Sequence, residues 1–232
     1  MSDYLEPTDP KVRSPEFAAP GRIRRTDAEG VYMRYGKRVL DVSGALLLIA
    51  VFLPIMLIVS IGVWRSGSPL LFGHRRVGQN GAQFRCLKFS SMLPDAEERL
   101  KDLLARDPVA RLQWEENQKL DDDPRVTRFG QILRKSSMDE LPQLWNVLKG
   151  EMSLVGPRPV TADELDRYGK SRDIYLSLRP GLTGRWQVGG RNEVSYDERV
   201  AMDVSYARDA GLWTDLQILT QTVGVVLGRT GR

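Results

Sequence analysis

One nearly continuous apolar run, from Val42 to Trp64, constrains this chain of 232 residues more than any other feature. Basic residues Lys37 and Arg38 precede the run, and Arg65 follows it directly. At ~1.5 Å rise per residue, a helix of this length crosses a hydrocarbon core of ~30 Å. The run begins too late for a signal peptide and lacks the small-residue cleavage site, so we expect the protein to retain it.

Pro54, near the middle of the run, makes a simple crossing doubtful. Proline removes a helix hydrogen bond and kinks or breaks the helix. Basic residues flank both ends, so the positive-inside rule does not assign those ends to opposite sides of the membrane. Hydropathy by itself favours a span, whereas the balanced charges also allow a helix that enters and leaves on one side.

The composition limits the remaining possibilities. Charged residues make up 28% and hydrophobic residues 41%, a globular balance that leaves room for one soluble domain beside the membrane element. A net charge of +4 suits an anionic partner, whether phosphate, lipid headgroup or nucleic acid. The single cysteine, Cys86, excludes an internal disulfide and a cysteine-rich zinc site. The single histidine, His74, is expected in a strand near the membrane surface rather than in a Ser-His-Asp triad.

Three parts are expected along the chain. Residues 1–33 lack hydrophobic periodicity and predict a flexible N-terminal arm, and residues 34–66 form the membrane-embedded helix. Residues 67–232 predict a small domain of mixed α/β class that is mostly helical, with amphipathic helices and a short β-hairpin. Its residues 94–120 predict helices that break near Asp107-Pro108.

The hairpin turn is predicted at Asn80-Gly81, a dipeptide typical of tight turns. The following strand, Phe84–Phe89, carries Lys88 near its end. Lys88 is equally consistent with an ordinary surface lysine and with a contact to phosphate.

The tract Ser137–Gln143 is the most informative chemically, because it holds the adjacent carboxylates Asp139 and Glu140 at the expected start of a helix. Ser137 and Glu140 have the spacing of a capping box, and Pro142 falls in the first turn. The positive field of the helix N-terminus would keep both acids ionised, ready to attack phosphorus or to bind a hard cation. Simple helix capping is the alternative that the local pattern favours. The predicted apolar face of this helix comprises Leu141, Leu144, Trp145 and Leu148.

Three further segments have two interpretations each. Asp121–Asp123 suggests an exposed loop more than a metal site. The glycine-rich region Arg179–Asn192, which includes Arg191, suits an anionic or sugar ligand or a structural loop, and it lacks the ending of a Walker loop. The segment Trp213–Leu227 is apolar on one side and is expected at the membrane interface or in the core.

Seven motifs, in this order, make the chain similar to the bacterial sugar transferase family, the monotopic phosphoglycosyl transferases. They are Lys37-Arg38-x-x-Asp41, Arg76-Val77-Gly78-x-x-Gly81-x-x-Phe84, Lys88-Phe89-x-x-Met92, Asp122-x-Pro124-Arg125-Val126-Thr127, Arg134-x-x-Ser137-x-Asp139-Glu140-Leu141-Pro142-Gln143, Gly156-Pro157-Arg158-Pro159 and Arg179-Pro180-Gly181-Leu182-Thr183-Gly184. The likeness runs from Lys37 to the C-terminus and includes the Trp186-Gln187 loop of members that prime exopolysaccharide synthesis. One departure is Ser90, where the family usually has an arginine, which puts one phosphate contact in question.

The resemblance implies a reaction. A hexose 1-phosphate, glucose or galactose, would pass from a UDP-sugar to undecaprenyl (polyprenyl) phosphate with release of UMP. Asp139 would attack the β-phosphorus to form an aspartyl-phosphosugar intermediate, and Mg²⁺ would bind near Asp139 and Glu140. Arg158 is the expected clamp for the nucleotide phosphates with Lys88 as a second cation, and Arg134 would face the lipid phosphate. Arg179 and Arg191 are further expected substrate contacts.

The resemblance also implies a re-entrant membrane helix on the cytoplasmic face of the bacterial inner membrane, in contact with membrane lipids and without a nucleic-acid partner. Whether the protein forms a homodimer stays open. The rival hypothesis is a non-enzymatic membrane-anchored scaffold that binds anionic lipid or partner proteins. A scaffold does not explain why Asp139-Glu140 should be accompanied by Arg134, Arg158 and Lys88.

Overall fold

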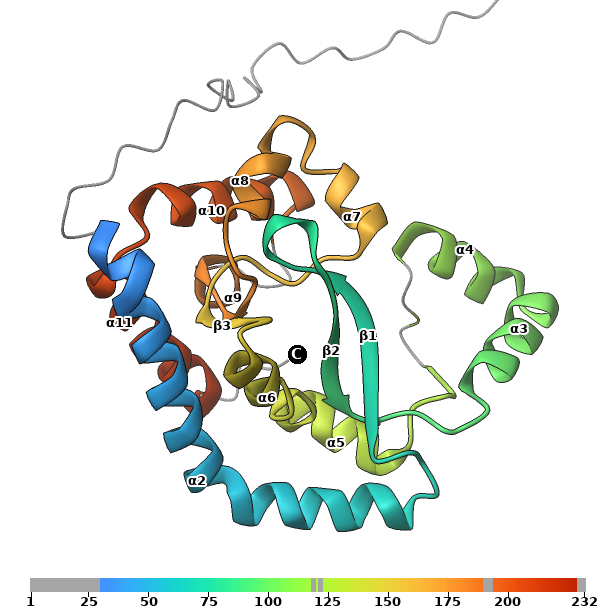
Figure 1. Ribbon diagram of the computed structural model, residues 1–232. Coiled ribbons are helices and arrows are strands. Elements are labelled where there is room, and N and C mark those ends of the chain that lie inside the picture. The colour runs from blue at the N-terminus through green and yellow to red at the C-terminus, as the bar shows by residue number, and fades with distance from the viewer. Residues whose placement is uncertain (1–29, 118–119, 121–122, 190–193, 229–232) are drawn as a thin grey trace, which may run out of the picture.

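The long apolar helix α2 (Lys37–Arg65) forms one edge of the molecule in the computed structural model, which describes residues 30–117, 120, 123–189 and 194–228 (Figure 1). A π-helical turn, η1 (Tyr32–Gly36), leads into it. The helix is continuous through Pro54, and Figure 1 shows it bending near its middle. Among the described residues this is the one helix long and apolar enough to cross a membrane. The expected arm, residues 1–33, lies almost wholly outside the described part.

The predicted hairpin is present. Strands β1 (Leu71–Val77) and β2 (Gln83–Phe89) pair antiparallel, in a register that runs from Leu71↔Phe89 to Val77↔Gln83. Asn80 and Gly81 adopt φ values of 57° and 80°, the left-handed conformation that this turn dipeptide tolerates. His74 lies in β1 and Lys88 is the next-to-last residue of β2, both as expected.

Helices α3 (Ala96–Arg106) and α4 (Pro108–Asn117) lie beyond the outer face of β1 (Figure 1). They separate at Asp107, which confirms the predicted break. Asp107 also accepts hydrogen bonds from the first backbone N–H groups of α4, those of Val109 and Ala110, at 2.8 and 3.1 Å.

The helix expected to start at Ser137 starts later. Helix α5 (Arg128–Ser136) ends at Ser137, whose φ of 56° is left-handed. A 3₁₀ turn, η3 (Met138–Glu140), follows, and α6 (Gln143–Lys149) begins after Pro142. The predicted capping box is therefore wrong, because Ser137 closes the preceding helix and its side chain caps nothing. The predicted apolar face is wrong at Trp145, which is 55% exposed.

A second, parallel strand pair was not predicted. Strand β3 (Ser153–Val155) pairs with β4 (Gly181–Thr183). Gly156, directly after β3, packs tightly against the segment that leads into β4. A Cβ at this position would lie 2.4 Å from the carbonyl oxygen of Arg179. The remaining elements are α7 (Ala162–Asp166), η4 (Gly169–Ser171), α8 (Arg172–Leu176), α9 (Arg185–Gly189), α10 (Tyr196–Asp209) and α11 (Leu212–Leu227).

The N-terminal half of α2 is bound to the core by its charged residues. Lys37 Nζ lies 2.6 Å from Asp215 Oδ2 on α11 and donates to the hydroxyl of Tyr206 at 3.0 Å. Arg38 donates to the carbonyl oxygens of Val147 and Leu148 at 2.6 and 2.7 Å, which satisfies the exposed end of α6.

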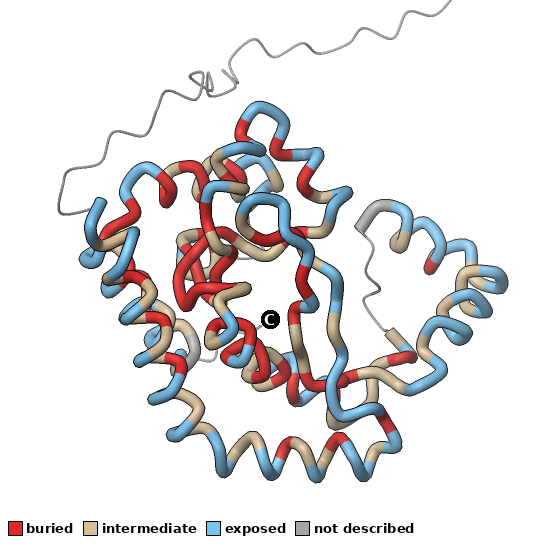
Figure 2. Tube along the Cα trace, viewed as in Figure 1, coloured by how far each residue is buried: buried red, intermediate tan, exposed pale blue. Residues whose placement is uncertain are grey.

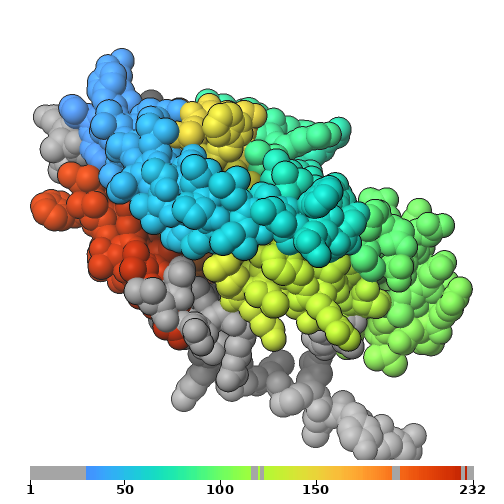
Figure 3. Space-filling model, turned by 90° about the horizontal axis from the view of Figure 1, so that it is seen from below, coloured from blue at the N-terminus to red at the C-terminus, as the bar shows by residue number. Residues whose placement is uncertain are grey.

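The C-terminal half of α2 packs on the same body. Val59 and Val63 are buried with Phe89 of β2 and Leu133 of α5. Figure 2 shows buried residues concentrated in the centre and on the inner side of α2, whereas much of its outer side is exposed. Seen from below in Figure 3, α2 crosses one whole face of the molecule. Both ends of the apolar helix are thus attached to one domain.

Candidate active site

Asp139, Glu140 and Lys88 come together from two elements that are distant in sequence. Lys88 projects from β2 and donates to Glu140 Oε1 at 2.6 Å across a separation of 52 residues. Its Nζ lies 3.8 Å from Asp139 Oδ2. The paired carboxylates of η3 therefore face a positive charge held by a strand.

Asp139 is the buried member of this group. Its side chain is 10% exposed, compared with 39% for Glu140. Burial raises the pKa of Asp139, while the positive charges of Lys88 and Arg134 act to lower it. The expectation that a helix N-terminus keeps Asp139 ionised is wrong, because α6 begins only at Gln143; side-chain cations take that role.

Arg134 approaches from α5. Its Nε donates to the hydroxyl of Ser91, just after β2, at 2.9 Å. This contact requires a close approach of α5, since a Cβ at Gly130 would lie 2.0 Å from the carbonyl oxygen of Ser91. The hydroxyl of Ser90, where the family usually has arginine, donates to the carbonyl of Met92 at 3.3 Å. Arg134 also lies within electrostatic range of Asp139.

Asp123 does not lie in an exposed loop. Its side chain is 10% exposed and forms a two-pronged pair with Arg125, with both contacts at 2.7 Å. Arg125 in turn lies over the ring of Trp114, 5.0 Å from its centroid. Asp123 is therefore a structural ion pair. Asp121 and Asp122 lie outside the described residues.

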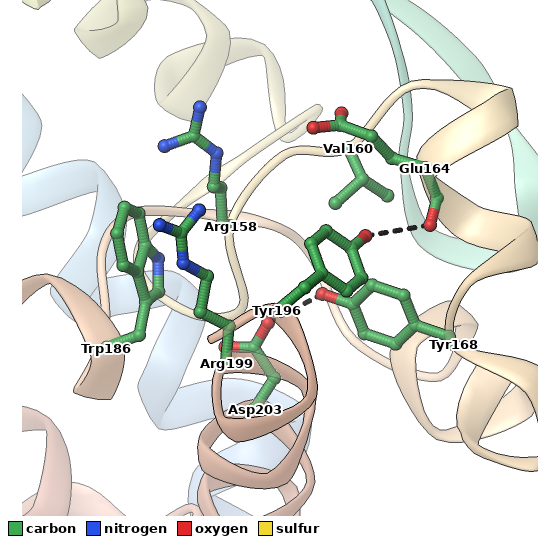
Figure 4. A pocket seen from close by; sticks show the side chains of 8 residues that line it. All are labelled: Arg158, Val160, Glu164, Tyr168, Trp186, Tyr196, Arg199 and Asp203. Atoms are coloured by element: carbon green, nitrogen blue, oxygen red, sulfur yellow. Dashed lines mark hydrogen bonds between the residues drawn. The ribbon is translucent and has the colours of Figure 1, made fainter. Parts of the chain in front are cut away.

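Arg158 lies near the β-hairpin that carries Lys88, because Val160, two residues further on, pairs with Val77 of β1. The buried thiol of Cys86 has its pKa raised to about 11, chiefly by burial, and the charges of Lys88, Glu140 and Arg158 all act on it. These three charged groups therefore lie within electrostatic range of one residue of β2. The Arg158 guanidinium carbon lies 5.0 Å from the ring centroid of Trp186 (Figure 4).

Comparison with known proteins identifies the family. Residues 32–229 match the sequence profile described as bacterial sugar transferase. The chain belongs to the bacterial sugar transferase family. The expected family membership is confirmed, and the motifs that carried it include the residues now seen around Asp139.

Individual relatives of this sugar transferase have informative names. A UDP-galactose-lipid carrier transferase of Erwinia amylovora is 52% identical over 198 residues, which are 85% of this chain and 42% of that protein. The exopolysaccharide production protein ExoY of Sinorhizobium fredii is 46% identical over 191 residues, 82% of this chain and 84% of that protein. A UDP-glucose:undecaprenyl-phosphate glucose-1-phosphate transferase of Caulobacter vibrioides is 42% identical over 200 residues, 82% and 69% of the two chains. The chain spans less than half the length of the Erwinia relative.

Two other arginines, Arg179 and Arg191, were also expected in the sugar transferase site. The backbone of Arg179 packs against Gly156, two residues before Arg158. Its side chain is half-buried, and no described residue forms a hydrogen bond or ion pair with it. Arg191 lies outside the described residues, so its predicted contact with substrate stays a prediction.

The donor set of the sugar transferase suits a magnesium ion shared with substrate. Mg²⁺ is usually held by one or two carboxylates together with waters and substrate phosphates. Asp139 and Glu140 supply two adjacent carboxylates, and within the described chain no group of three acidic, histidine or cysteine side chains could hold a metal alone. A metal at this site would therefore depend on the phosphates of a bound donor.

Two residues beside Arg158 were not predicted as site residues. Trp186 was noted only as part of a loop, and Arg199 on α10 lies in a segment of ordinary charged helical pattern. The Arg199 guanidinium carbon lies 4.8 Å from the same Trp186 ring (Figure 4). No local signal distinguishes Arg199, since its neighbourhood is created by chain segments far from it in sequence.

Proposed function

We propose that this protein transfers hexose 1-phosphate, from UDP-glucose or UDP-galactose, to a polyprenyl phosphate as the priming step of exopolysaccharide synthesis. The observation that carries the proposal is the buried carboxylate of Asp139, next to Glu140 and 3.8 Å from the ammonium group of Lys88. Relatives named for UDP-galactose and UDP-glucose support the choice of donor. The name of the Erwinia relative also includes a lipid carrier, which agrees with the acceptor. That of the Sinorhizobium relative includes exopolysaccharide production, which agrees with the pathway.

In the first step, an Asp139 oxygen attacks the β-phosphorus of the UDP-sugar. The bond from that phosphorus to the bridging oxygen breaks, and UMP leaves with the bridging oxygen and its electron pair. An acyl phosphate then joins Asp139 to the sugar phosphate. Lys88 and Arg158 reduce the repulsion between the carboxylate and the anionic diphosphate.

In the second step, an oxygen of the polyprenyl phosphate attacks the same phosphorus. The bond to Asp139 breaks, which regenerates the carboxylate and yields a polyprenyl diphosphate sugar. Arg134 supports this step because it lies on α5, which packs against the C-terminal half of α2. The lipid phosphate would therefore approach from the side of the apolar helix.

Glu140 and Asp139 would hold the Mg²⁺ together with donor phosphate oxygens. When bound, the ion supplies neutralisation of the charge that develops on the leaving phosphate. Glu140 would orient the metal site. Because Lys88 pairs with Glu140 in this structure, it would have to move from Glu140 to the donor phosphates when the metal and the donor are bound.

We further propose that α2 is re-entrant, with both ends on the cytoplasmic face of the inner membrane. Lys37 at one end and Val63 at the other are buried against the same domain, and the bend near Pro54 allows the chain to return. The exposed apolar side chains of α2 would contact lipid; they include Leu46, Leu47, Val51, Leu57, Ile58, Ile61 and Trp64.

Release of UMP tests the function directly. Purified protein with Mg²⁺, polyprenyl phosphate and each of UDP-glucose, UDP-galactose and their N-acetyl forms should release UMP with a hexose donor. A membrane scaffold without activity would release none. Turnover of only the N-acetylated donors would show that the hexose assignment is wrong.

A further inference from the structure

We propose that Arg199 and Trp186 complete, with Arg158, a two-guanidinium site for the nucleotide-side phosphate of the donor, the phosphate that leaves as UMP. The inference rests on the proposed function and adds two binding residues to it. Trp186, the second residue of α9, is 6% exposed and therefore forms a fixed platform. The guanidinium carbons of Arg158 and Arg199 lie 5.0 and 4.8 Å from its ring centroid.

Two acids, Glu164 and Asp203, line the same pocket, but neither forms an ion pair with Arg158 or Arg199. In the described part of the chain no carboxylate lies within ion-pair distance of either one. Glu164, which lines the same pocket, is engaged by Arg76 at 2.6 Å and by the N–H of Thr161 at 2.8 Å. An aromatic face stabilises a cation by only ~0.5–2 kcal/mol, so the pair of positive charges favours an anion.

Asp203, the other acid of the pocket, offsets this charge only in part. Its Oδ2 accepts a hydrogen bond from the hydroxyl of Tyr168 at 2.7 Å. Burial raises the pKa of Asp203 to about 7. Figure 4 shows Asp203 and Tyr168 on one side of the pocket and the Arg158 guanidinium on the other, pointing away from them.

Arg199 also carries an unmet hydrogen-bond donor. Its Nε is buried and has no hydrogen-bond partner among the described residues, and neither has Nε1 of Trp186. Buried donors are normally paired, so these two N–H groups are available to an acceptor that enters the pocket. Phosphate oxygens match paired guanidinium groups well, because each fork can bind two oxygens.

The position of the pocket selects which phosphate it binds. Val160, which lines the pocket, pairs with Val77 of β1, and the neighbouring strand β2 carries Lys88, whose Nζ lies 3.8 Å from Asp139 Oδ2. The pocket and the Asp139 carboxylate therefore lie along one β-hairpin. With the β-phosphorus beside Asp139, the nucleotide-side phosphate is the next group along the donor. Arg158 would then contact both phosphates, and Arg199 would contact only the one that leaves.

Binding of UMP tests the inference without turnover. In an Asp139→Asn background, we expect Arg199→Gln to weaken UMP binding roughly ten- to hundred-fold by calorimetry, as is usual for loss of a charge-assisted hydrogen bond. Arg199→Lys should restore part of the affinity. Trp186→Phe should keep the fold and weaken UMP binding less than Arg199→Gln. Arg208→Gln removes an exposed charge from the same helix and should leave UMP binding unchanged.

Steady-state kinetics separates this inference from the proposed function. With active protein, Arg199→Gln should raise the KM for the UDP-sugar and the inhibition constant of UMP, and leave the KM for polyprenyl phosphate unchanged. Wild-type protein that releases no UMP would contradict the function itself. UMP binding within twofold of wild type in a folded Arg199→Gln variant, or a raised KM for the lipid acceptor in its place, would overturn the assignment of Arg199.

Discussion

Lys88 pairs with Glu140 more closely than with Asp139: its Nζ lies 2.6 Å from Glu140 Oε1 and 3.8 Å from Asp139 Oδ2. The more exposed acid therefore takes the closer ion pair and the hydrogen bond, and the buried acid interacts with Lys88 at a longer distance. This division suits the proposed roles, in which Asp139 attacks and Glu140 orients the metal.

Replacement of Asp139 by Asn should abolish UMP release and the covalent intermediate while the protein stays folded. Because the folded-state pKa of Asp139 is raised, its contribution to stability is full below pH 3.8 and is lost as pH rises through the folded value. Asp139→Asn should therefore not lower the unfolding temperature at neutral pH. Peptide mapping of radiolabelled sugar phosphate gives the direct test, and label on Glu140 would refute the assignment.

The pH profile of kcat/KM should show an acid limb above pH 3.8, the ordinary value for aspartate, because burial raises the pKa of Asp139. Lys88 lowers that pKa, so Lys88→Gln should move the limb to higher pH as well as reduce activity. UMP release measured from pH 4 to 8, roughly the range over which carboxylates of raised pKa titrate, locates the limb. A limb that stays in place or moves to lower pH would contradict this role of Lys88.

Removal of divalent metal should stop the reaction, and Mg²⁺ should restore it. Glu140→Gln should require a higher Mg²⁺ concentration for half-maximal activity, because it loses one charged ligand. The Mg²⁺ dependence of UMP release measures this shift. The matched control is Glu97→Gln on α3, which removes an exposed acid and should leave the dependence unchanged. Full activity of wild-type protein in chelator would show that the metal proposal is wrong.

Lys37→Met should destabilise the protein by about 3–5 kcal/mol, the usual cost of leaving one partner of a buried ion pair alone. The side chains of Lys37 and Asp215 are 7% and 0% exposed. Combining Lys37→Met with Asp215→Leu should cost less than the sum of the single changes. Thermal unfolding in detergent measures all three variants. The exposed pair Arg106 and Asp102, at 3.8 Å, is the control and should contribute little.

Replacement of Pro54 by Leu should straighten α2 and move part of the protein to a spanning topology. Val31→Cys, at a position 62% exposed, reports the N-terminal end by its accessibility to an impermeant thiol reagent in spheroplasts. Native Cys86 gives little background, because it is 4% exposed and burial raises the pKa of its thiol to about 11.

With Pro54 intact, Val31→Cys should be protected from reagent outside the membrane, and Glu97→Cys should be protected in both backgrounds. Leu53→Val is the matched control, since it changes the neighbouring residue without restoring a backbone donor. Labelling of Val31→Cys from outside with Pro54 present would rule out the re-entrant arrangement.

Local chemistry in the sequence was sufficient for several elements. Asn80-Gly81 specified the hairpin because few dipeptides accept left-handed φ at adjacent positions. Pro108 specified the break after α3, and the length of the apolar run specified α2. In each case the deciding interaction lies within a few residues along the chain.

The capping box failed for the opposite reason. Ser137 and Glu140 have the required spacing, but Ser137 ends α5 and Glu140 is bound by Lys88 from β2. A helix cap contributes only ~1 kcal/mol, so tertiary contacts such as the pair between Lys88 and Glu140 can override it. Asp139 lies in a 3₁₀ turn, where burial raises its pKa.

The sequence by itself determined the long apolar helix, the hairpin, the motif that holds Asp139 and Glu140, and the family. Only the tertiary structure decided which cations meet which carboxylates. Lys37 finds Asp215 across 178 residues, and Arg199 meets Arg158 on the ring of Trp186. Such partners carry no signal in sequence spacing, because their contact exists only after the core has brought separate elements together.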